Sequence, residues 1–220
     1  MSKPTDGLET TNRLSVCQPI GTMDRRIDRG RATRQHLIEV ATALFAEHGY
    51  DGTSIETVLE TAGVSRGSLY HHFPSKERLF EAVVEGVHTQ VGEATLEAAA
   101  AAGDADPTEL LRAGYLAWVR LAGEPVVRRI LLIDAPTVLG WRRWRRMEEQ
   151  YGLGMLKDVL GAAADAGRLD RGLVDPFAHM LLATGNELAL LIALADDVPA
   201  AQASAEAAFD EFVRRLLPSA

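Results

Sequence analysis

The sequence predicts an all-α protein, with an N-terminal three-helix domain that contains a helix-turn-helix and a larger helical domain after it. Apolar residues recur at three- and four-residue spacing along most of the 220 residues, and no stretch alternates as a strand would. Proline and glycine punctuate this pattern where helices would begin and end. Residues 53–76 hold two short helical segments around a central glycine, the pattern of a helix-turn-helix.

The composition is that of an ordinary globular protein, with 47% hydrophobic and 25% charged residues. No uninterrupted apolar run reaches the roughly 18 residues that span a bilayer, and the N-terminus lacks a signal-peptide pattern. We therefore expect no membrane partner. The single cysteine, Cys17, cannot form an internal disulfide and fits a reducing compartment, so a cytoplasmic location is predicted.

The charge is unevenly distributed along the chain. The net charge of −8 argues against a protein that coats nucleic acid indiscriminately. Residues 25–80 carry eight Lys or Arg and seven Asp or Glu, whereas residues 81–220 carry 13 and 21. A near-neutral segment with clustered arginines is compatible with selective DNA binding.

Residues 1–30 show no sustained periodicity and are rich in Thr, Pro, Gly and Ser, so we expect a disordered tail that ends in a basic segment. Met23 begins this basic segment and could be the native start, which would leave residues 1–22 outside the native protein. The arginines fit either a solvated lead-in or a basic arm that contacts phosphates or a minor groove. They are Arg25, Arg26, Arg29, Arg31 and Arg34.

A first helix is predicted over residues 33–48 from its apolar stripe, and Gly49 ends it in the usual C-terminal position. Thr53 is the expected N-cap of the second helix. Glu56 follows three residues later and completes a capping box. The second helix then runs to a break at Gly63.

The third helix is predicted over residues 66–72, capped by Ser65 and stopped by Pro74. It is too short to be stable alone, so Leu69 and Phe73 must hold it by packing. The side chains left to face outward are small, basic or aromatic, which suits close approach to base edges and phosphates. They are Arg66, Gly67, Ser68, Tyr70, His71 and His72.

A fourth helix is expected from Lys76 to about residue 102. Proline starts and glycine stops divide the remainder into helices, with a break expected at Asp134-Ala135-Pro136. These helices are predicted over residues 107–122, 125–133, 139–165, 176–194 and 202–217.

Several short motifs carry a family resemblance: Gly49-Tyr50, Thr53-Ser54-Ile55, Ala62-Gly63-Val64-Ser65, Leu69-Tyr70, His72-Phe73 and Ser75-Lys76. With them, residues 33–80 resemble the DNA-binding domain of the TetR family of bacterial repressors. The resemblance implies a DNA-binding head over residues 31–76 and a helical regulatory and dimerisation domain over 77–220. It also implies a homodimer that a small-molecule effector releases from a palindromic double-stranded DNA operator, without a cofactor.

The chemistry of these residues and the resemblance assign similar DNA-binding roles. Arg66 can bind guanine through two hydrogen bonds, which discriminates against other bases by about 1–3 kcal/mol. The adjacent pair His71 and His72 would point about 100° apart on a helix, so we predict no metal site there. The predicted DNA-binding residues are Arg31, Thr33, Thr53, Ser54, Ser65, Arg66, Gly67, Ser68, Tyr70, His71, His72 and Lys76.

Aromatic side chains concentrate in the C-terminal half, where each fits either an ordinary core or the wall of an apolar cavity. The predicted cavity residues are Tyr115, Trp118, Trp141, Trp144, Met147, Tyr151, Met180, Thr184 and Asn186. The arginines around Trp144 are interpreted as a solvated helix face, paired with acids such as Glu148 and Glu149.

The last two predicted helices carry more apolar surface than one monomer can cover, which favours a four-helix dimer interface. Its predicted residues are Phe177, Leu181, Leu188, Phe209, Phe212, Val213 and Leu216. Two alternatives stay open from the residues: a DNA-binding regulator without a ligand, and a helical enzyme. We find no nucleophile–base pair, phosphate loop or metal-ligand spacing that favours the enzyme.

Overall fold

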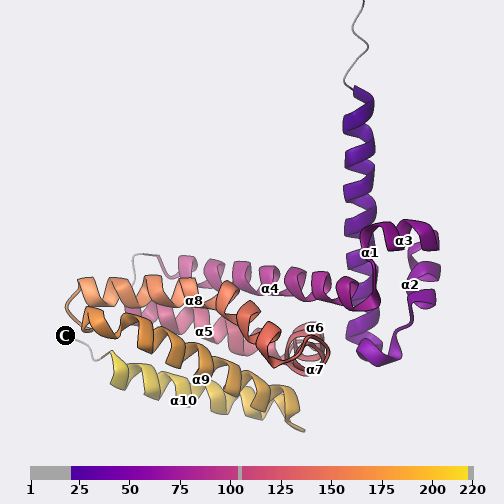
Figure 1. Cartoon of the computed structure of the whole chain (residues 1–220). Coiled ribbons are helices and arrows are strands. Elements are labelled where there is room, and N and C mark those ends of the chain that lie inside the picture. Colours follow the sequence, from indigo (N-terminus) through magenta and orange to yellow (C-terminus); the bar gives the residue numbers. More distant parts are fainter. Residues whose placement is uncertain (1–20, 104–105, 218–220) are drawn as a thin grey trace, which may run out of the picture. The chain divides into compact units, whose positions relative to one another are not determined.

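The computed structural model describes residues 21–103 and 106–217, and their regular structure is helical, as predicted (Figure 1). The described residues up to Thr33 form one compact unit, and those from Arg34 onward form the other. The elements are α1 (Gly21–Gly52), α2 (Ile55–Ala62), α3 (Arg66–His72), α4 (Lys76–Ala101), α5 (Pro107–Gly123), α6 (Pro125–Val127), the π-helix η1 (Arg128–Asp134), α7 (Ala135–Leu139), α8 (Trp141–Asp165), the 3₁₀-turn η2 (Arg171–Leu173), α9 (Val174–Leu194) and α10 (Val198–Leu216).

The first helix is longer than predicted. The sequence placed its start at Thr33, but α1 begins at Gly21 and includes the end of the predicted tail. No proline interrupts residues 21–32, and their arginines are good helix formers, so the helix can extend N-terminally. The Thr33 hydroxyl donates to the Arg29 carbonyl oxygen at 2.9 Å. Residues 1–20 lie outside the described residues.

Gly49 interrupts α1 where the sequence predicted, with φ +73° and ψ 174°. The next turn leads to Thr53, which is buried instead of capping the second helix. Its hydroxyl donates to the Gly49 carbonyl oxygen at 2.8 Å and lies 3.2 Å from the Leu44 carbonyl oxygen. The Thr53 hydroxyl therefore supplies a donor to carbonyl oxygens near the C-terminal end of α1, which lack a partner within the helix.

Ser54 is the N-cap of α2, and its Oγ accepts a hydrogen bond from the Thr57 N–H at 3.0 Å. The predicted capping box from Thr53 to Glu56 is wrong, because the turn uses one more residue before the helix starts. Gly63 ends α2 in the left-handed conformation, with φ +63°. Ser65 then caps α3 by accepting from the Ser68 N–H at 3.2 Å, and α3 has the predicted bounds.

Helices α1, α2 and α3 share a core with the N-terminal half of α4. Leu69 and Phe73 of α3 are buried, as predicted, in a core that also contains Phe45 of α1 and Phe80 of α4. The Phe45 and Phe80 rings meet edge to face, with centroids 5.1 Å apart. The same core continues along α4 to Val87.

The remaining helices form the body of the molecule, with α4 and α8 lying on α5 and α9, and α10 on the outside (Figure 1). A second core lies between α5, α8, α9 and α10, and it includes Leu160, Ile192 and Phe209. The helix predicted over 202–217 starts earlier, at Val198, because Pro199 occupies its first turn, where a proline costs no hydrogen bond.

The predicted break at Asp134-Ala135-Pro136 is wrong. The chain stays helical from Pro125 to Leu139 and breaks instead at Gly140, which has φ +79°. Pro136 is accommodated in the first turn of α7, directly after the π-helix η1. Trp144 fixes this segment from α8 by donating its indole N–H to the Leu131 carbonyl oxygen at 3.0 Å.

One described helical stretch, Arg171–Ala193, is long and apolar enough to cross a membrane by length and composition alone. In the structure α9 packs against neighbouring helices and buries Leu181, Leu182 and Ile192 among others. Its apolar composition is therefore accounted for by its place in the body.

Gly49→Ala should destabilise the fold, by roughly 1–3 kcal/mol, because an L side chain is strained at this φ. The added Cβ would also fall on the Arg129 guanidinium. Gly154→Ala is the matched control, since its Cβ would meet no heavy atom within 4 Å and the helix should gain about 0.5–1 kcal/mol. Urea denaturation measures both changes, and equal stability of the two variants would contradict the role of Gly49.

Candidate functional site

The outward face of α3 combines exposed polar and aromatic side chains. Arg66, Tyr70 and His71 are exposed, whereas Ser68 and His72 are half-buried. A Cβ on Gly67 would meet no heavy atom within 4 Å, so packing inside the chain does not require glycine there. The missing side chain leaves room for a group that approaches α3 closely.

Arg66 is paired with Glu56 across the turn between α2 and α3. Both side chains are more than half exposed, and the hydrogen bond raises the pKa of Arg66 and contributes to lowering that of Glu56. The sequence missed this partner because it assigned Glu56 to the capping box. The contact holds the guanidinium at the start of α3 and must open or shift for Arg66 to reach a base.

The flanks of α3 carry two further cations. The Lys76 ammonium lies 4.1 Å from the centroid of the Tyr50 ring, and burial lowers its pKa. The Arg34 guanidinium lies 5.1 Å from the centroid of Phe73. Burial lowers the pKa of His72, with smaller contributions from the positive charges of His71 and Arg34. Arg34 therefore contacts the residue that directly follows α3, and Lys76 begins the next helix, α4.

Thr53 is the one predicted DNA contact that the structure contradicts, because its side chain is buried and bonded to α1. Ser54 and Ser65 are exposed at the first turns of α2 and α3. Arg31 and Thr33 belong to the first unit, and their DNA contacts stay predictions from the sequence.

A cavity of about 100 Å³, partly open to solvent, lies between α4, α5, α8 and α9. Four of the predicted residues line it: Tyr115, Trp118, Tyr151 and Asn186. Most of the remaining wall is apolar and includes Leu111, Met155, Leu156, Val159, Leu181 and Leu182. A mostly apolar lining with a few polar groups is typical of a site for a small organic ligand.

The other predicted cavity residues lie elsewhere. Trp144 and Met147 are buried in the core shared with α4, because they project from α8 toward η1. Trp141 is 63% exposed and Met180 is 51% exposed, each on the outer surface of its helix. Thr184 is half-buried and does not line the cavity. Helical spacing identified apolar faces in these cases but not the face that turns toward the cavity.

Four buried polar atoms of the cavity wall lack a hydrogen-bond partner in the described residues: His88 Nε2, Tyr115 OH, Glu148 Oε1 and Asn186 Nδ2. They come from α4, α5, α8 and α9 respectively. Each unpaired buried polar group costs about 1–3 kcal/mol, so such a cluster calls for a partner.

Burial controls the ionisation of this cluster. Desolvation raises the pKa of Glu148 to about 7, while Asn186 and the charge of Arg145 oppose the shift. Desolvation lowers the pKa of His88 to about 4, so the imidazole is neutral at neutral pH. The His88 Nε2 and Glu148 Oε1 atoms are 3.4 Å apart.

The sequence missed His88 and Glu148. Glu148 was expected on a solvated face, paired with arginine, but it is buried, and only Glu149 pairs with Arg145, at 3.2 Å. One signal was present: Trp144, Glu148 and Tyr151 share a helical face. A charged residue in an otherwise apolar stripe is a candidate for a buried functional group.

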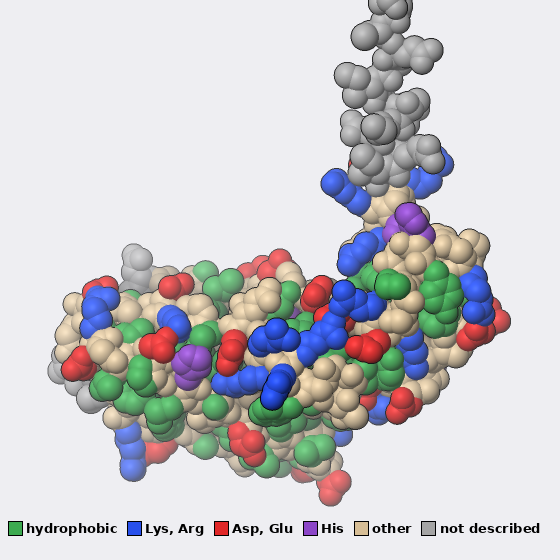
Figure 2. Space-filling model, viewed as in Figure 1, with side chains coloured by type: hydrophobic (Ala, Val, Ile, Leu, Met, Phe, Trp, Pro, Cys, Tyr) green, Lys and Arg blue, Asp and Glu red, His purple; other side chains and the backbone are tan. Residues whose placement is uncertain are grey.

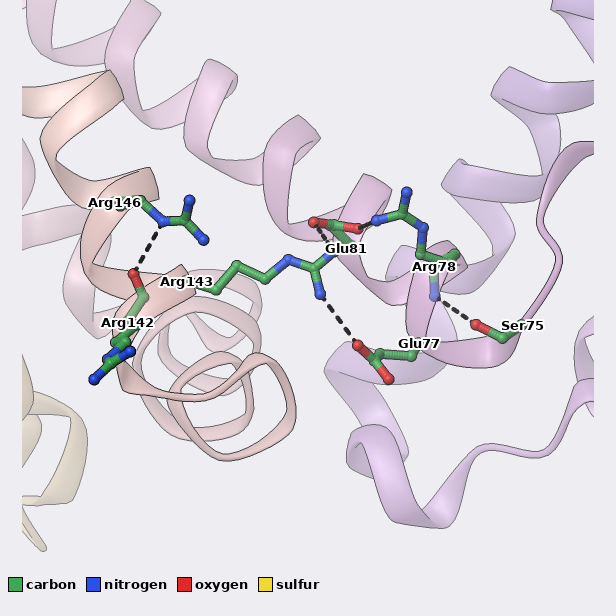
Figure 3. Close-up of polar contacts among 7 residues, drawn as sticks. All are labelled: Ser75, Glu77, Arg78, Glu81, Arg142, Arg143 and Arg146. Carbon is green, nitrogen blue, oxygen red and sulfur yellow. Dashed lines mark hydrogen bonds and ion pairs between the residues drawn. The ribbon is translucent and has the colours of Figure 1, made fainter.

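Ion pairs join the start of α8 to the start of α4. Arg143 reaches between Glu77 and Glu81, and Arg78 pairs with the other oxygen of Glu81 (Figure 3). The distance from Arg143 Nη1 to Glu77 Oε1 is 3.1 Å. Figure 2 shows basic and acidic side chains interspersed over this part of the surface. The ion pairs of Arg143 thus connect α8, the helix that carries Glu148, to the first turns of α4.

The predicted dimer residues fall into two groups. Leu181, Phe209 and Val213 are buried in the second core, so they cannot meet another subunit. Their apolar spacing reflects packing between α9, α10 and α5. The half-buried residues stay predictions: Phe177, Leu188, Phe212 and Leu216.

The exposed apolar face of α9 is formed by other residues. Met180, Leu191 and Leu194 are 51%, 56% and 71% exposed. With Thr184 and Glu187 they follow alternate spacings of four and three residues, which places them along one face. This spacing resembles the seam of helices that pair with a partner.

These features define a helix-turn-helix protein whose fourth helix leads into a helical domain with a mostly apolar cavity. Residues 37–83 match the family model of bacterial regulatory proteins of the tetR family, and residues 108–216 match the tetracyclin repressor-like C-terminal domain. The chain belongs to the TetR family, as the motifs around α3 predicted.

Among curated relatives, the HTH-type transcriptional repressor AcnR of Corynebacterium diphtheriae is 42% identical over 64 residues, 29% of this chain and 34% of that protein. This chain matches such curated relatives over only about a third of their length. A TetR-family regulator from Pectobacterium atrosepticum has a TM-score of 0.77 and 28% identity, covering 87% of this chain and 97% of its own. The Bacillus subtilis regulator FadR, solved with stearoyl-CoA, shares the fold with a TM-score of 0.64 at 20% identity, covering 84% and 97%.

Glu148→Gln should gain stability over the wild type as pH rises. The folded pKa of Glu148 is raised, so its contribution to stability is present below pH 4.5 and is lost as pH rises through about 7. The difference in unfolding free energy should grow to roughly 3 kcal/mol, since each pH unit between 4.5 and about 7 contributes about 1.36 kcal/mol. Urea denaturation across this range measures it.

Glu149→Gln is the matched control for this measurement. Glu149 is only half-buried and pairs with Arg145, so its substitution should give a nearly pH-independent difference over the same range. A flat profile for Glu148→Gln as well would contradict the raised pKa.

Proposed function

We propose that this protein is a homodimeric, DNA-binding transcriptional repressor of the cytoplasm that leaves its operator when a small molecule binds the cavity. The observation that carries the proposal is the pairing of an exposed recognition face on α3 with an unsatisfied polar cluster in a cavity lined by α4. The names of the curated relatives, which are transcriptional regulators and repressors, support it. The cavity favours it over a regulator without a ligand.

In this proposal α3 enters the major groove, and Arg66 reads a guanine once its contact with Glu56 opens. Ser54, Tyr70, His71 and Lys76 contact bases or phosphates around it, with Arg31 and Thr33 as further contacts from the start of the chain. Two heads in a dimer would read half-sites about 34–36 Å apart. The operator is therefore expected to be a palindrome.

The cavity can influence the head through α4. His88 lies 12 residues after Lys76, about 18 Å along one continuous helix. Glu148 on α8 is connected to the same helix through Arg143, which binds Glu77 and Glu81. A ligand that favours one spacing of α4 and α8 would change the separation of the two heads, and it acts only through its differential affinity for the two states.

Arg66→Ala should relax base preference at one position of each half-site, by about 1–3 kcal/mol. Lys76→Ala should weaken binding to all sequences and flatten the dependence of log K on log salt by about one. Selection from random DNA provides the operator, and titrations across salt concentration compare the variants. Arg120→Ala on α5 is the control.

Identical behaviour of the Arg66 and Lys76 variants would refute this division of labour. If the wild type selects and binds no DNA at low salt, the hypothesis of a DNA-binding regulator is rejected, and the alternative of a helical enzyme is favoured.

Leu191→Arg should dissociate the proposed dimer, because it would bury a charge without a partner in the apolar face of α9. The dimer dissociation constant should rise by at least about 100-fold. Leu96→Arg on α4 is the control, since Leu96 is similarly exposed, at 54%, but lies on another helix. Sedimentation equilibrium measures both, and an unchanged dimer with Leu191→Arg would move the interface elsewhere.

A further inference from the structure

The cavity contains one acidic side chain and, among the described residues that line it, no Lys or Arg. Its imidazole, His88, is neutral because burial lowers its pKa to about 4. An anionic ligand would lose its hydration here without gaining a counter-charge. The lining therefore disfavours carboxylates, phosphates and acyl-thioesters of anionic carriers, and it favours neutral or cationic ligands.

Two unpaired polar atoms lie side by side in the cavity wall. Glu148 Oε1 and His88 Nε2 are 3.4 Å apart, and neither has a hydrogen-bond partner. With its proton on Nδ1, His88 offers Nε2 as an acceptor, and Tyr115 OH can accept from the opposite helix. A protonated amine supplies several N–H donors for Glu148 Oε1 and His88 Nε2, whereas the remaining unpaired amide nitrogen, Asn186 Nδ2, is itself a donor.

Aromatic rings surround the same space. Tyr115, Trp118 and Tyr151 line the cavity, and Tyr151 stacks on the His88 ring with centroids 5.1 Å apart. The Trp118 ring is held by its N–H, which donates to the Gly185 carbonyl oxygen at 3.1 Å. Aromatic faces attract cations, most strongly when water is excluded. The leucines and Met155 leave the rest of the cavity for a hydrocarbon body.

We propose that the effector is an organic amine, a monocation with an apolar body, whose ammonium group is bound by Glu148 with His88 as a further acceptor. This inference rests on the proposed function, since it names the chemical class of the effector. A neutral alcohol or phenol could fill the same space, but it would not stabilise the ionised form of the Glu148 carboxyl, which burial disfavours.

The test compares three probes of one shape on the full-length protein: 4-phenylbutylamine, 4-phenylbutan-1-ol and 4-phenylbutanoate. At neutral pH the amine is protonated, like a lysine side chain. Calorimetric titration should show the amine binding at least about tenfold more tightly than the alcohol, because hydrogen bonds to charged groups are the stronger ones. The carboxylate should bind most weakly.

Glu148→Gln isolates the contribution of the carboxylate. The amine should lose its preference over the alcohol in this variant, so that the ratio of the two affinities falls to about one. Glu149→Gln, one residue along α8 and outside the cavity lining, should keep the wild-type ratio. If Glu148→Gln fails to fold, the order of the three probes on the wild type still decides the question.

The proposal is overturned if the alcohol or the carboxylate binds as tightly as the amine, if no probe binds, or if Glu148→Gln keeps the preference. Operator binding without any probe is measured in parallel. A protein that binds its operator but does not prefer the amine refutes the effector class alone. A protein that binds no DNA refutes the proposed function, whatever the probes do.

Discussion

The packing of α4 into one continuous core is the constraint on which the rest of the structure depends. Phe80 is fully buried against Phe45 near the start of this helix, and Val87 is buried further along. The same cluster extends to Ile130 and Trp144 in the body. Because close-packed side chains transmit displacements, the head is not an independent module on a flexible linker. The predicted boundary between residues 76 and 77 stays a proposal, and it falls at the first residue of this shared helix.

Two sets of polar contacts also join the head to the body. Asp134, at the end of η1, accepts hydrogen bonds from the Tyr50 N–H at 2.8 Å and from Arg129 Nε at 3.1 Å. Arg143 binds the first turns of α4 from the start of α8. The body thus holds the head at the end of α1 and at the start of α4. A π-helix at one of these places fits the frequent occurrence of such segments at functional sites.

The unpaired polar groups of the cavity wall lower the stability of the fold and are available to bind a ligand. An apolar residue at position 148 would pack between α4 and α9 without the cost of a desolvated carboxyl, and Leu or Met would fit the surrounding wall. The chain instead keeps Glu148 beside a neutral His88, and no Lys or Arg belongs to the described lining. Such a cluster is explained more readily by a ligand that completes it than by folding, since folding gains nothing from unpaired polar atoms.

The sequence by itself determined the features that depend on neighbours in the chain. Helix caps and turns depend on hydrogen bonds between residues a few positions apart. They determine the helix ends at Gly49 and Gly63, the cap at Ser65 and the bounds of α3. Tertiary structure decided the inward turn of Thr53, the burial of Glu148, and the division of α9 between core and exposed face. Helical periodicity shows that a face is apolar, but not whether a neighbouring helix, a ligand or a second subunit covers it. That choice depends on contacts between residues far apart in the chain, which is why the cavity became visible only in the folded protein.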